Sequence, residues 1–186
     1  MPEEETQFNF PTLPEVPLPP EDSDLKIAVL KRQFIEFLRP RDTDDANDGT
    51  FIALNNTPGI QFADAATKVA YFIFFPKSDL TIHSMQFIWS TSATSGNLRW
   101  QIDIGEGGDS EATNVRTTGG TAVSTAADGT ANELSYTEIL TAGTGVSLSS
   151  LRKVNLWGIK FTRLGAAAED TLTAAVNLYG ILIKYT

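Results

Sequence analysis

Asn97-Leu-Arg-Trp-Gln-Ile-Asp-Ile104 is the stretch that decides the fold class, because its apolar and polar residues alternate without a break. Successive side chains of an extended strand point to opposite faces. One face would carry Leu98, Trp100, Ile102 and Ile104, and the other would carry Arg99, Gln101 and Asp103. Such period-two alternation predicts a β-strand with one face packed on a core and the other facing solvent.

Further strands are predicted on both sides of this stretch, wherever β-branched and aromatic runs lie between clusters of Gly, Ser, Thr, Asn and Asp. They cover residues 32–39, 50–54, 68–75, 80–89, 134–140, 154–163 and 175–186. The segment Gly105–Asn132 is rich in Gly, Thr and Ala, and we expect a long loop with one short strand near 121–125. We therefore predict an all-β fold, an antiparallel jelly-roll β-sandwich of about eight strands, over residues 25–186.

The N-terminal residues 1–24 have a different composition and predict an extended, acidic, Pro-rich arm. They contain six of the nine prolines and seven acidic residues without a Lys or Arg. The rest of the chain holds 16 acids and 14 bases, a net charge of −2 out of the total of −9. Proline fixes its own φ and favours extended geometry in the residue before it. Between arm and sandwich, residues 25–31 fit a short helix or turn capped by Asp24.

Five apolar residues recur between the prolines of the arm, and we take them as candidate partner-binding residues. They are Phe8, Phe10, Leu13, Val16 and Leu18. Each large apolar side chain that is buried contributes about 1.5–3 kcal/mol, which favours docking of the arm on a neighbouring subunit. A disordered tail is the alternative, because low hydrophobicity with high charge is typical of disorder. The negative arm would be repelled by DNA, so no nucleic-acid partner is expected.

Composition and spacing also argue against catalysis. The chain has no Cys and a single His, His83, so thiolate chemistry and His-based metal sites are not expected. No cofactor, membrane span or secretory signal is expected either. The acidic run Asp42–Gly49 fails the register of an EF-hand, and we interpret it as a solvated loop, although irregular Ca²⁺ binding stays open. Gly105–Ser110 lacks the Lys-Ser/Thr of a phosphate loop.

Several other residues have a possible functional interpretation, and for the carboxylates and tryptophans the structural interpretation is favoured. Asp103 and Glu106 could imitate a glycosidase pair, which would need a sugar cleft between them. Trp89, Trp100 and Trp157 are in phase with core residues, although an exposed tryptophan could stack on a sugar. The scattered arginines include Arg39, Arg41, Arg99, Arg116, Arg152 and Arg163, some of which could pair with a neighbour's acidic arm.

Residues 32–186 resemble, in patches, the small jelly-roll domains of tailed-bacteriophage virion proteins. The resemblance rests on the final strand pair, Trp157–Leu164 followed by Glu169–Tyr185, and on a hairpin from Trp89 to Trp100. It also rests on the Arg41-Asp42 turn and the strand end Phe74-Phe75-Pro76. It implies a capsid decoration, head-fibre or tail-associated protein, commonly assembled as a trimer.

We therefore expect a non-catalytic virion structural protein that decorates or stabilises a phage capsid. Its expected partners are copies of itself, in a homotrimer, and the major capsid protein or another virion protein. It would be assembled in the host cytoplasm and reside in the virion. The alternative is a receptor- or carbohydrate-binding module of a head or tail fibre, with a glycan as its ligand.

Overall fold

The computed structural model describes residues 34–41, 49–54, 57–76, 79–108, 116–140 and 155–186. The chain divides into two units, Met1–Arg32 and Gln33–Thr186, and every described residue belongs to the second unit. The predicted arm over 1–24, with Phe8, Phe10, Leu13, Val16 and Leu18, lies outside the described residues, as does the predicted helix over 25–31. All elements discussed below are therefore elements of the second unit.

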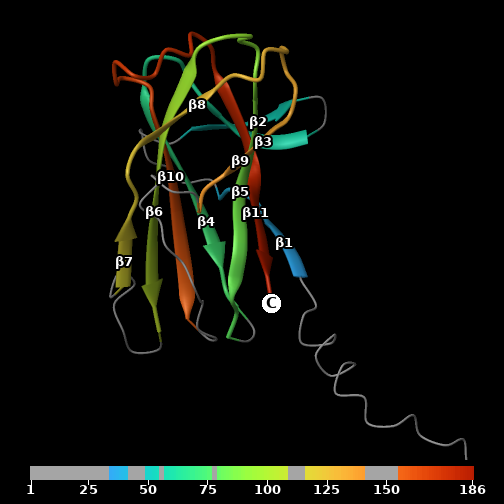
Figure 1. Cartoon of the computed structure of the whole chain (residues 1–186), viewed down its shortest axis with the longest axis vertical. Coiled ribbons are helices and arrows are strands. Elements are labelled where there is room, and N and C mark those ends of the chain that lie inside the picture. Colours follow the sequence, from blue (N-terminus) through green and yellow to red (C-terminus); the bar gives the residue numbers. More distant parts are fainter. Residues whose placement is uncertain (1–33, 42–48, 55–56, 77–78, 109–115, 141–154) are drawn as a thin grey trace, which may run out of the picture. The chain divides into compact units, whose positions relative to one another are not determined.

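The second unit is built from β-strands, and its described residues contain no helix (Figure 1). The strands are β1 (Phe34–Leu38), β2 (Thr50–Leu54), β3 (Thr57–Phe62), β4 (Thr67–Phe74), β5 (Ile82–Thr91), β6 (Asn97–Gly107), β7 (Arg116–Gly119), β8 (Val123–Ala126), β9 (Ser135–Glu138), β10 (Leu156–Leu164) and β11 (Val176–Tyr185). The predicted alternation of β6 is confirmed, because Leu98, Trp100, Ile102 and Ile104 are buried.

The strands form two antiparallel sheets packed as a sandwich. Sheet A has the order β2-β3-β11-β5-β9, with β1 also paired to β11, and sheet B has the order β4-β10-β6-β7, with β8 also paired to β6. Consecutive strands from β3 to β6, and again from β9 to β11, alternate between the two sheets. This architecture confirms the predicted all-β, antiparallel jelly-roll sandwich.

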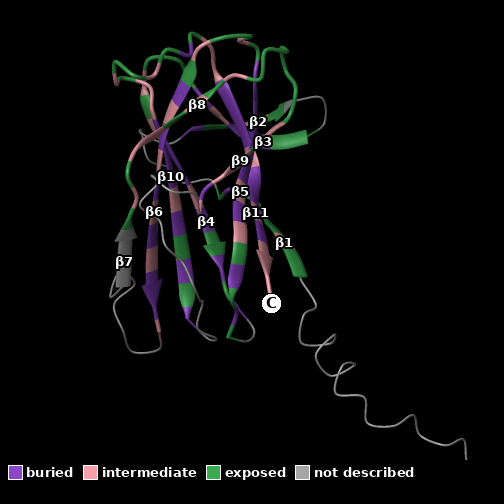
Figure 2. Cartoon of the chain, in the orientation of Figure 1, coloured by how far each residue is buried: buried purple, intermediate pink, exposed green. Residues whose placement is uncertain are grey.

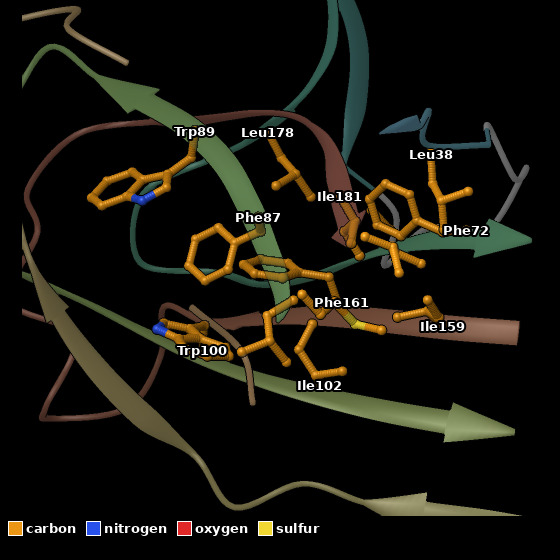
Figure 3. Packing of buried hydrophobic residues seen from close by; sticks show 14 of the residues in the cluster. Leu38, Phe72, Phe87, Trp89, Trp100, Ile102, Ile159, Phe161, Leu178 and Ile181 are labelled. Atoms are coloured by element: carbon orange, nitrogen blue, oxygen red, sulfur yellow. The ribbon is translucent and has the colours of Figure 1, made fainter. Parts of the chain in front are cut away.

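Aromatic rings fill the centre of the sandwich, where the inner faces of the two sheets meet (Figure 3). Phe87 of β5 lies 4.7 Å from Trp100 of β6 and 5.0 Å from Phe161 of β10, in both cases edge to face. Trp89 and Trp100 donate their indole N–H groups to Thr137 and Thr125. All three tryptophans are buried, which confirms their interpretation as core residues.

Two connections differ from the sequence prediction, because strands that are close in sequence belong to opposite sheets. The predicted hairpin from Trp89 to Trp100 is wrong: β5 lies in sheet A and β6 in sheet B. The predicted final strand pair is wrong for the same reason, since β10 lies in sheet B and β11 in sheet A. Gly96 lies in the connection from β5 to β6 and has a φ of +98°. A Cβ at this position would lie 2.5 Å from the Thr171 carbonyl oxygen.

The segment from Gly105 to Asn132 is more ordered into strands than predicted, because β6 continues to Gly107 and both β7 and β8 pair with it. Gly105–Gly107 is therefore part of a strand. The sequence prediction also missed β3, which contains Pro58 and Gly59. Proline is tolerated there because β11 pairs with β3 only from Ile60 onward, so Pro58 has a strand on one side alone.

Arg163 is an internal cross-link, so it is not among the arginines that could pair with a neighbour's arm. Its side chain is fully buried and holds the Asp170 carboxylate through Nε at 3.1 Å and Nη2 at 3.0 Å. Its remaining N–H groups donate to the carbonyl oxygens of Phe62, Ala63, Leu172 and Ala174. The guanidinium thereby ties the end of β3 to the connection that leads into β11.

Candidate functional site

β1 is an edge strand that exposes apolar side chains on both of its faces. It pairs with β11 alone among the described strands, along the stretch Ile181–Tyr185, while β3 occupies the preceding stretch of the same edge. Phe34, Ile35 and Phe37 are 51%, 64% and 44% exposed, and β1 is coloured as exposed over most of its length in Figure 2. Exposed apolar edge strands invite pairing with another chain, and natural proteins usually blunt or cover them.

Three further exposed apolar residues extend this feature, and we call the six together the β1 surface. Its members are Phe34, Ile35, Phe37, Phe51, Ile73 and Phe75. Phe75 shares a cavity with Phe34, whereas Phe51 and Ile73 each share a cavity with Phe37. Five of the six residues, all except Ile35, therefore line cavities next to β1, and clusters of exposed apolar side chains mark interaction sites on soluble proteins.

The first of these cavities, of 290 Å³, lies where β1, β4 and the C-terminal end of β11 meet. Phe34 stacks on Tyr185 at 5.8 Å between ring centroids, and Phe74 lies 6.3 Å from Tyr185. The Tyr185 hydroxyl donates to the Glu36 carboxylate at 3.4 Å. Burial raises the pKa of Tyr185, and the Glu36 charge and the hydrogen bond to Glu36 raise that pKa further.

The second cavity is a groove of 250 Å³ that we call the outer groove. Three rings and two prolines line it together with Arg39; they are Phe37, Phe51, Tyr179, Pro40 and Pro58. The Tyr179 hydroxyl is held by Ser90 at 2.9 Å. Two glycines make room for the rings, because a Cβ on Gly180 would collide with Phe37 and a Cβ on Gly59 would lie 3.2 Å from the Tyr179 ring. The outer groove is thus an aromatic-lined channel built into the sheet.

Two cations lie beside this apolar region. Arg39 lines the outer groove, and both Arg39 and Arg41 line the third cavity, of 400 Å³, together with Phe37 and Ile73. Both side chains are exposed, and neither makes an ion pair with any described residue. The backbone of Arg41 bridges to Tyr71 of β4, which fixes the place where the chain crosses from sheet A to sheet B.

The other sequence candidates do not converge on a catalytic arrangement. Asp103 lies on the outer face of β6, and Glu106 is buried on the inner face beside Asn155, so the imagined carboxylate pair points to opposite sides of one strand. His83 is exposed on β5 and shares a hydrogen bond of 3.0 Å with the Thr186 hydroxyl, as the structural interpretation predicts. The acidic residues Asp42–Asp48 lie outside the described residues.

Sequence reasoning missed the β1 surface, although the signal was present. Phe34, Ile35, Phe37 and Leu38 place apolar side chains in both phases of one short strand, whereas a half-buried strand needs them in one phase only. The cavities beside β1 depend on residues from β2, β4 and β11, which no local pattern brings together.

Within the described ranges, no three His, Cys, Asp or Glu side chains gather as a metal site would require. In the same part of the chain there is no helix long and apolar enough to cross a membrane.

Comparison with known proteins gives likenesses of fold. No protein-family model and no curated protein matches the chain. Solved structures similar to it include a family 35 carbohydrate binding module from an environmental isolate, at 14% identity and TM-score 0.44, covering 82% of this chain and 91% of that one. A CBM35 from Cellvibrio japonicus is 12% identical, with TM-score 0.42 and 82% and 92% covered.

The structure of infectious bursal disease virus Gx strain is also similar, at 12% identity and TM-score 0.41, covering 83% of this chain and 32% of that one. None of these likenesses bears on function, because the identities and TM-scores are too low.

Proposed function

We propose that this chain is a non-catalytic structural protein that assembles with copies of itself through the β1 surface. In its fuller form, the proposal is a virion protein, a homotrimer that decorates or stabilises a phage capsid and contacts its neighbours through the N-terminal arm. The sequence resemblance motivates the phage assignment, and the exposed edge strand motivates the assembly.

The observation that carries the proposal is the exposure of large apolar side chains on the edge strand β1. Phe34, Ile35 and Phe37 are 51%, 64% and 44% exposed, and the partners of Ile35 and Phe37 on β11, Lys184 and Leu182, are themselves only half-buried. Fully burying a large apolar side chain contributes about 1.5–3 kcal/mol, and because these side chains are about half exposed, an assembly that covers them would gain roughly half of that amount for each. An extended segment that pairs with the edge would also satisfy backbone groups.

Sedimentation velocity of the full chain tests the proposal. We expect wild type to sediment as an oligomer, with a mass three times that of the chain if the trimer is right. Ile35→Asp should weaken self-association about tenfold or more, because it places a charge in the buried interface. Tyr136→Asp is the matched control. Tyr136 is 56% exposed on β9, at the other edge of sheet A, and its substitution should leave self-association unchanged.

Phe75→Ser provides a second variant outside β1, so that the test survives if Ile35→Asp disturbs the strand. Urea unfolding of each variant reports whether the fold is kept. A wild-type chain that stays monomeric at every concentration would refute the proposal, as would equal masses for wild type and both folded variants.

A second candidate function is glycan binding on the outer face of sheet B. Lys160 of β10 pairs with Tyr71 of β4 on one side and Asp103 of β6 on the other, so an aromatic ring, a cation and a carboxylate lie in one row. In the next row Gly158 pairs with Gly105, and a Cβ on Gly158 would meet no atom within 4 Å. A sugar could stack on the ring and hydrogen-bond to the charged groups beside these two glycines.

The Asp103 carboxylate is already held in place, which suits a binding role. It accepts hydrogen bonds from Gln101 Nε2 at 2.9 Å and from the Gly120 backbone N–H at 3.3 Å. The test is a glycan array with wild type, Tyr71→Ser and Tyr136→Ser. Binding that only Tyr71→Ser abolishes supports this candidate, and an array without hits for wild type excludes it.

A further inference from the structure

We propose that the outer groove is the acceptor for the Pro-rich segment 10–20 of a second copy of the chain. This inference rests on the proposed self-assembly and deepens it, because it names the occupant and the groove that receives it.

The chemistry of the groove fits a proline-rich peptide. Phe37, Phe51 and Tyr179 present three rings around one channel, and Pro40 and Pro58 add further rigid apolar surface. Aromatic-lined grooves are a recurrent means of recognising polyproline II segments, which are extended and preformed and therefore lose little entropy on binding. Because Gly180 and Gly59 lack a Cβ, two of these rings pack close to the sheet backbone and leave the channel open.

The occupant has the complementary composition. Phe10-Pro-Thr-Leu-Pro-Glu-Val-Pro-Leu-Pro-Pro20 contains five prolines with apolar residues between them. Phe10, Leu13, Val16 and Leu18 recur at intervals of two or three, close to the three-residue turn of a polyproline helix, so most of them share one side. A segment of this kind can place apolar side chains into the groove and keep Glu15 outside it.

Charge complementarity also favours docking of this segment in the outer groove. Residues 1–24 carry seven acids and no base, and Glu15, Glu21 and Asp22 lie within or directly after the proposed segment. The groove side carries Arg39, with Arg41 in the adjoining cavity, and neither makes an ion pair with a described residue. Carboxylates of the incoming segment would pair with these guanidinium groups, and such exposed pairs steer and orient more than they stabilise.

The length of the chain before β1 places a second copy within reach. Residues 21–33 separate the segment from Phe34, and at about 3.1 Å per residue an extended linker of this length spans up to about 40 Å. A domain of the size of the second unit has a radius of gyration of about 15 Å. The segment can therefore pass beyond its own domain and reach the groove of a neighbour.

A complementation experiment with full-length chains tests the inference. One variant, Phe51→Asp, loses the groove and keeps the segment; the other, Leu13→Asp/Leu18→Asp, loses the segment and keeps the groove. We expect each variant alone to self-associate at least about tenfold more weakly than wild type, because each removes an apolar anchor. An equal mixture should form a 1:1 complex that grows no further, because it contains one working groove and one working segment.

Thr12→Asp is the control, since it adds one negative charge at a polar position of the segment, where the segment variant adds two at apolar positions, and it should leave assembly unchanged. A synthetic peptide of residues 8–22 should compete with assembly of wild type, and its binding to the Leu13→Asp/Leu18→Asp chain should weaken as salt is raised. Phe51 is half exposed, so its substitution is expected to leave the fold intact, and urea unfolding checks this.

Three results would overturn the inference. If the segment variant assembles like wild type while Ile35→Asp does not, assembly through the β1 surface stands and the occupant is not this segment. The second result is that neither the groove variant nor the segment variant changes the oligomer mass, while the peptide binds the Leu13→Asp/Leu18→Asp chain and adding Phe51→Asp to that chain abolishes the binding. In that case the groove holds the segment of its own chain. If the peptide binds no variant, the groove is not a receptor for it.

Discussion

At the scale of single residues, Arg163 is a buried charged side chain whose position requires many hydrogen bonds. Its guanidinium is fully buried, and its N–H groups reach one buried carboxylate, four backbone carbonyls and, at 3.5 Å, the half-exposed Asp64. The planar fork of arginine can satisfy this many acceptors, whereas lysine has three donors on one nitrogen. The residue therefore acts as a structural cross-link between β3 and the connection into β11.

Replacing Arg163 by methionine should destabilise the fold by about 3–5 kcal/mol, because the Asp170 carboxylate would remain buried without its partner. Arg163→Lys should recover only part of this loss. Urea unfolding measures both variants against Arg99→Lys, a matched change at a less buried arginine that donates to Ser124. Similar unfolding midpoints for Arg163→Met and Arg99→Lys would disprove the cross-link.

Tyr185 gives a pH-dependent prediction at the same scale. Burial, the Glu36 charge and the hydrogen bond to Glu36 all raise its pKa above the ordinary 10.0. The folded state thus retains the phenol proton at pH values where the unfolded chain loses it. The stability it contributes is present below pH 10 and falls as pH rises through the folded-state pKa.

Glu36→Gln removes the charge and the acceptor strength but leaves the burial, so it should lower the pKa of Tyr185 without restoring the ordinary value. Absorbance at alkaline pH resolves the titration of the four tyrosines. We expect one of them to ionise at lower pH in the variant. A tyrosinate titration curve identical to that of wild type would show that Glu36 does not act on Tyr185.

At the scale of elements, β1 owes its position to a glycine on its neighbour. A Cβ on Gly180 of β11 would collide with the Phe37 ring and come within 2.5 Å of the Leu38 carbonyl oxygen. Gly158 of β10 is a strand glycine with open space around it. The two positions therefore separate the effect of crowding β1 from the general effect of adding a methyl group to a strand.

Gly180→Ala should destabilise the domain by about 1–3 kcal/mol, as overpacking does. Gly158→Ala should be neutral or should stabilise by about 0.5–1 kcal/mol, because alanine loses less conformational freedom on folding. Urea unfolding compares the two. Because Phe37 lines the outer groove, Gly180→Ala should also weaken self-association, and an effect on neither property would show that β1 does not depend on this contact.

The elements also show where sequence patterns succeed. β6 was predictable because one face alone is buried, and β4 because it ends at Phe74, just before Phe75-Pro76. β3 was missed because Pro58 and Gly59 contradict strand propensity, and tertiary pairing on one side overrides that propensity. The two connections were mistaken for local pairings because the sequence of a connection does not show whether it joins neighbouring strands of one sheet or crosses between sheets.

At the scale of the whole molecule, the sequence predicted the sandwich but not its candidate site. The core could be inferred from period-two alternation, since burial follows from local patterns within each strand. The outer groove could not, because Phe37, Phe51 and Tyr179 come from three strands whose neighbourhood only the sheet order defines. The arm residues Phe8, Phe10, Leu13, Val16 and Leu18 remain predicted partner-binding residues, and the groove is the proposed acceptor for the last four.

The central claim is that the β1 surface is covered in the assembled protein, and hydrogen exchange of the full chain at low and high concentration measures this directly. We predict that backbone amides of residues 34–38 exchange more slowly as the oligomer forms, while those of β9, at the other edge of sheet A, do not change. Slower exchange in β9 with unchanged exchange in β1, or no protection at either edge in a proven oligomer, would contradict the claim.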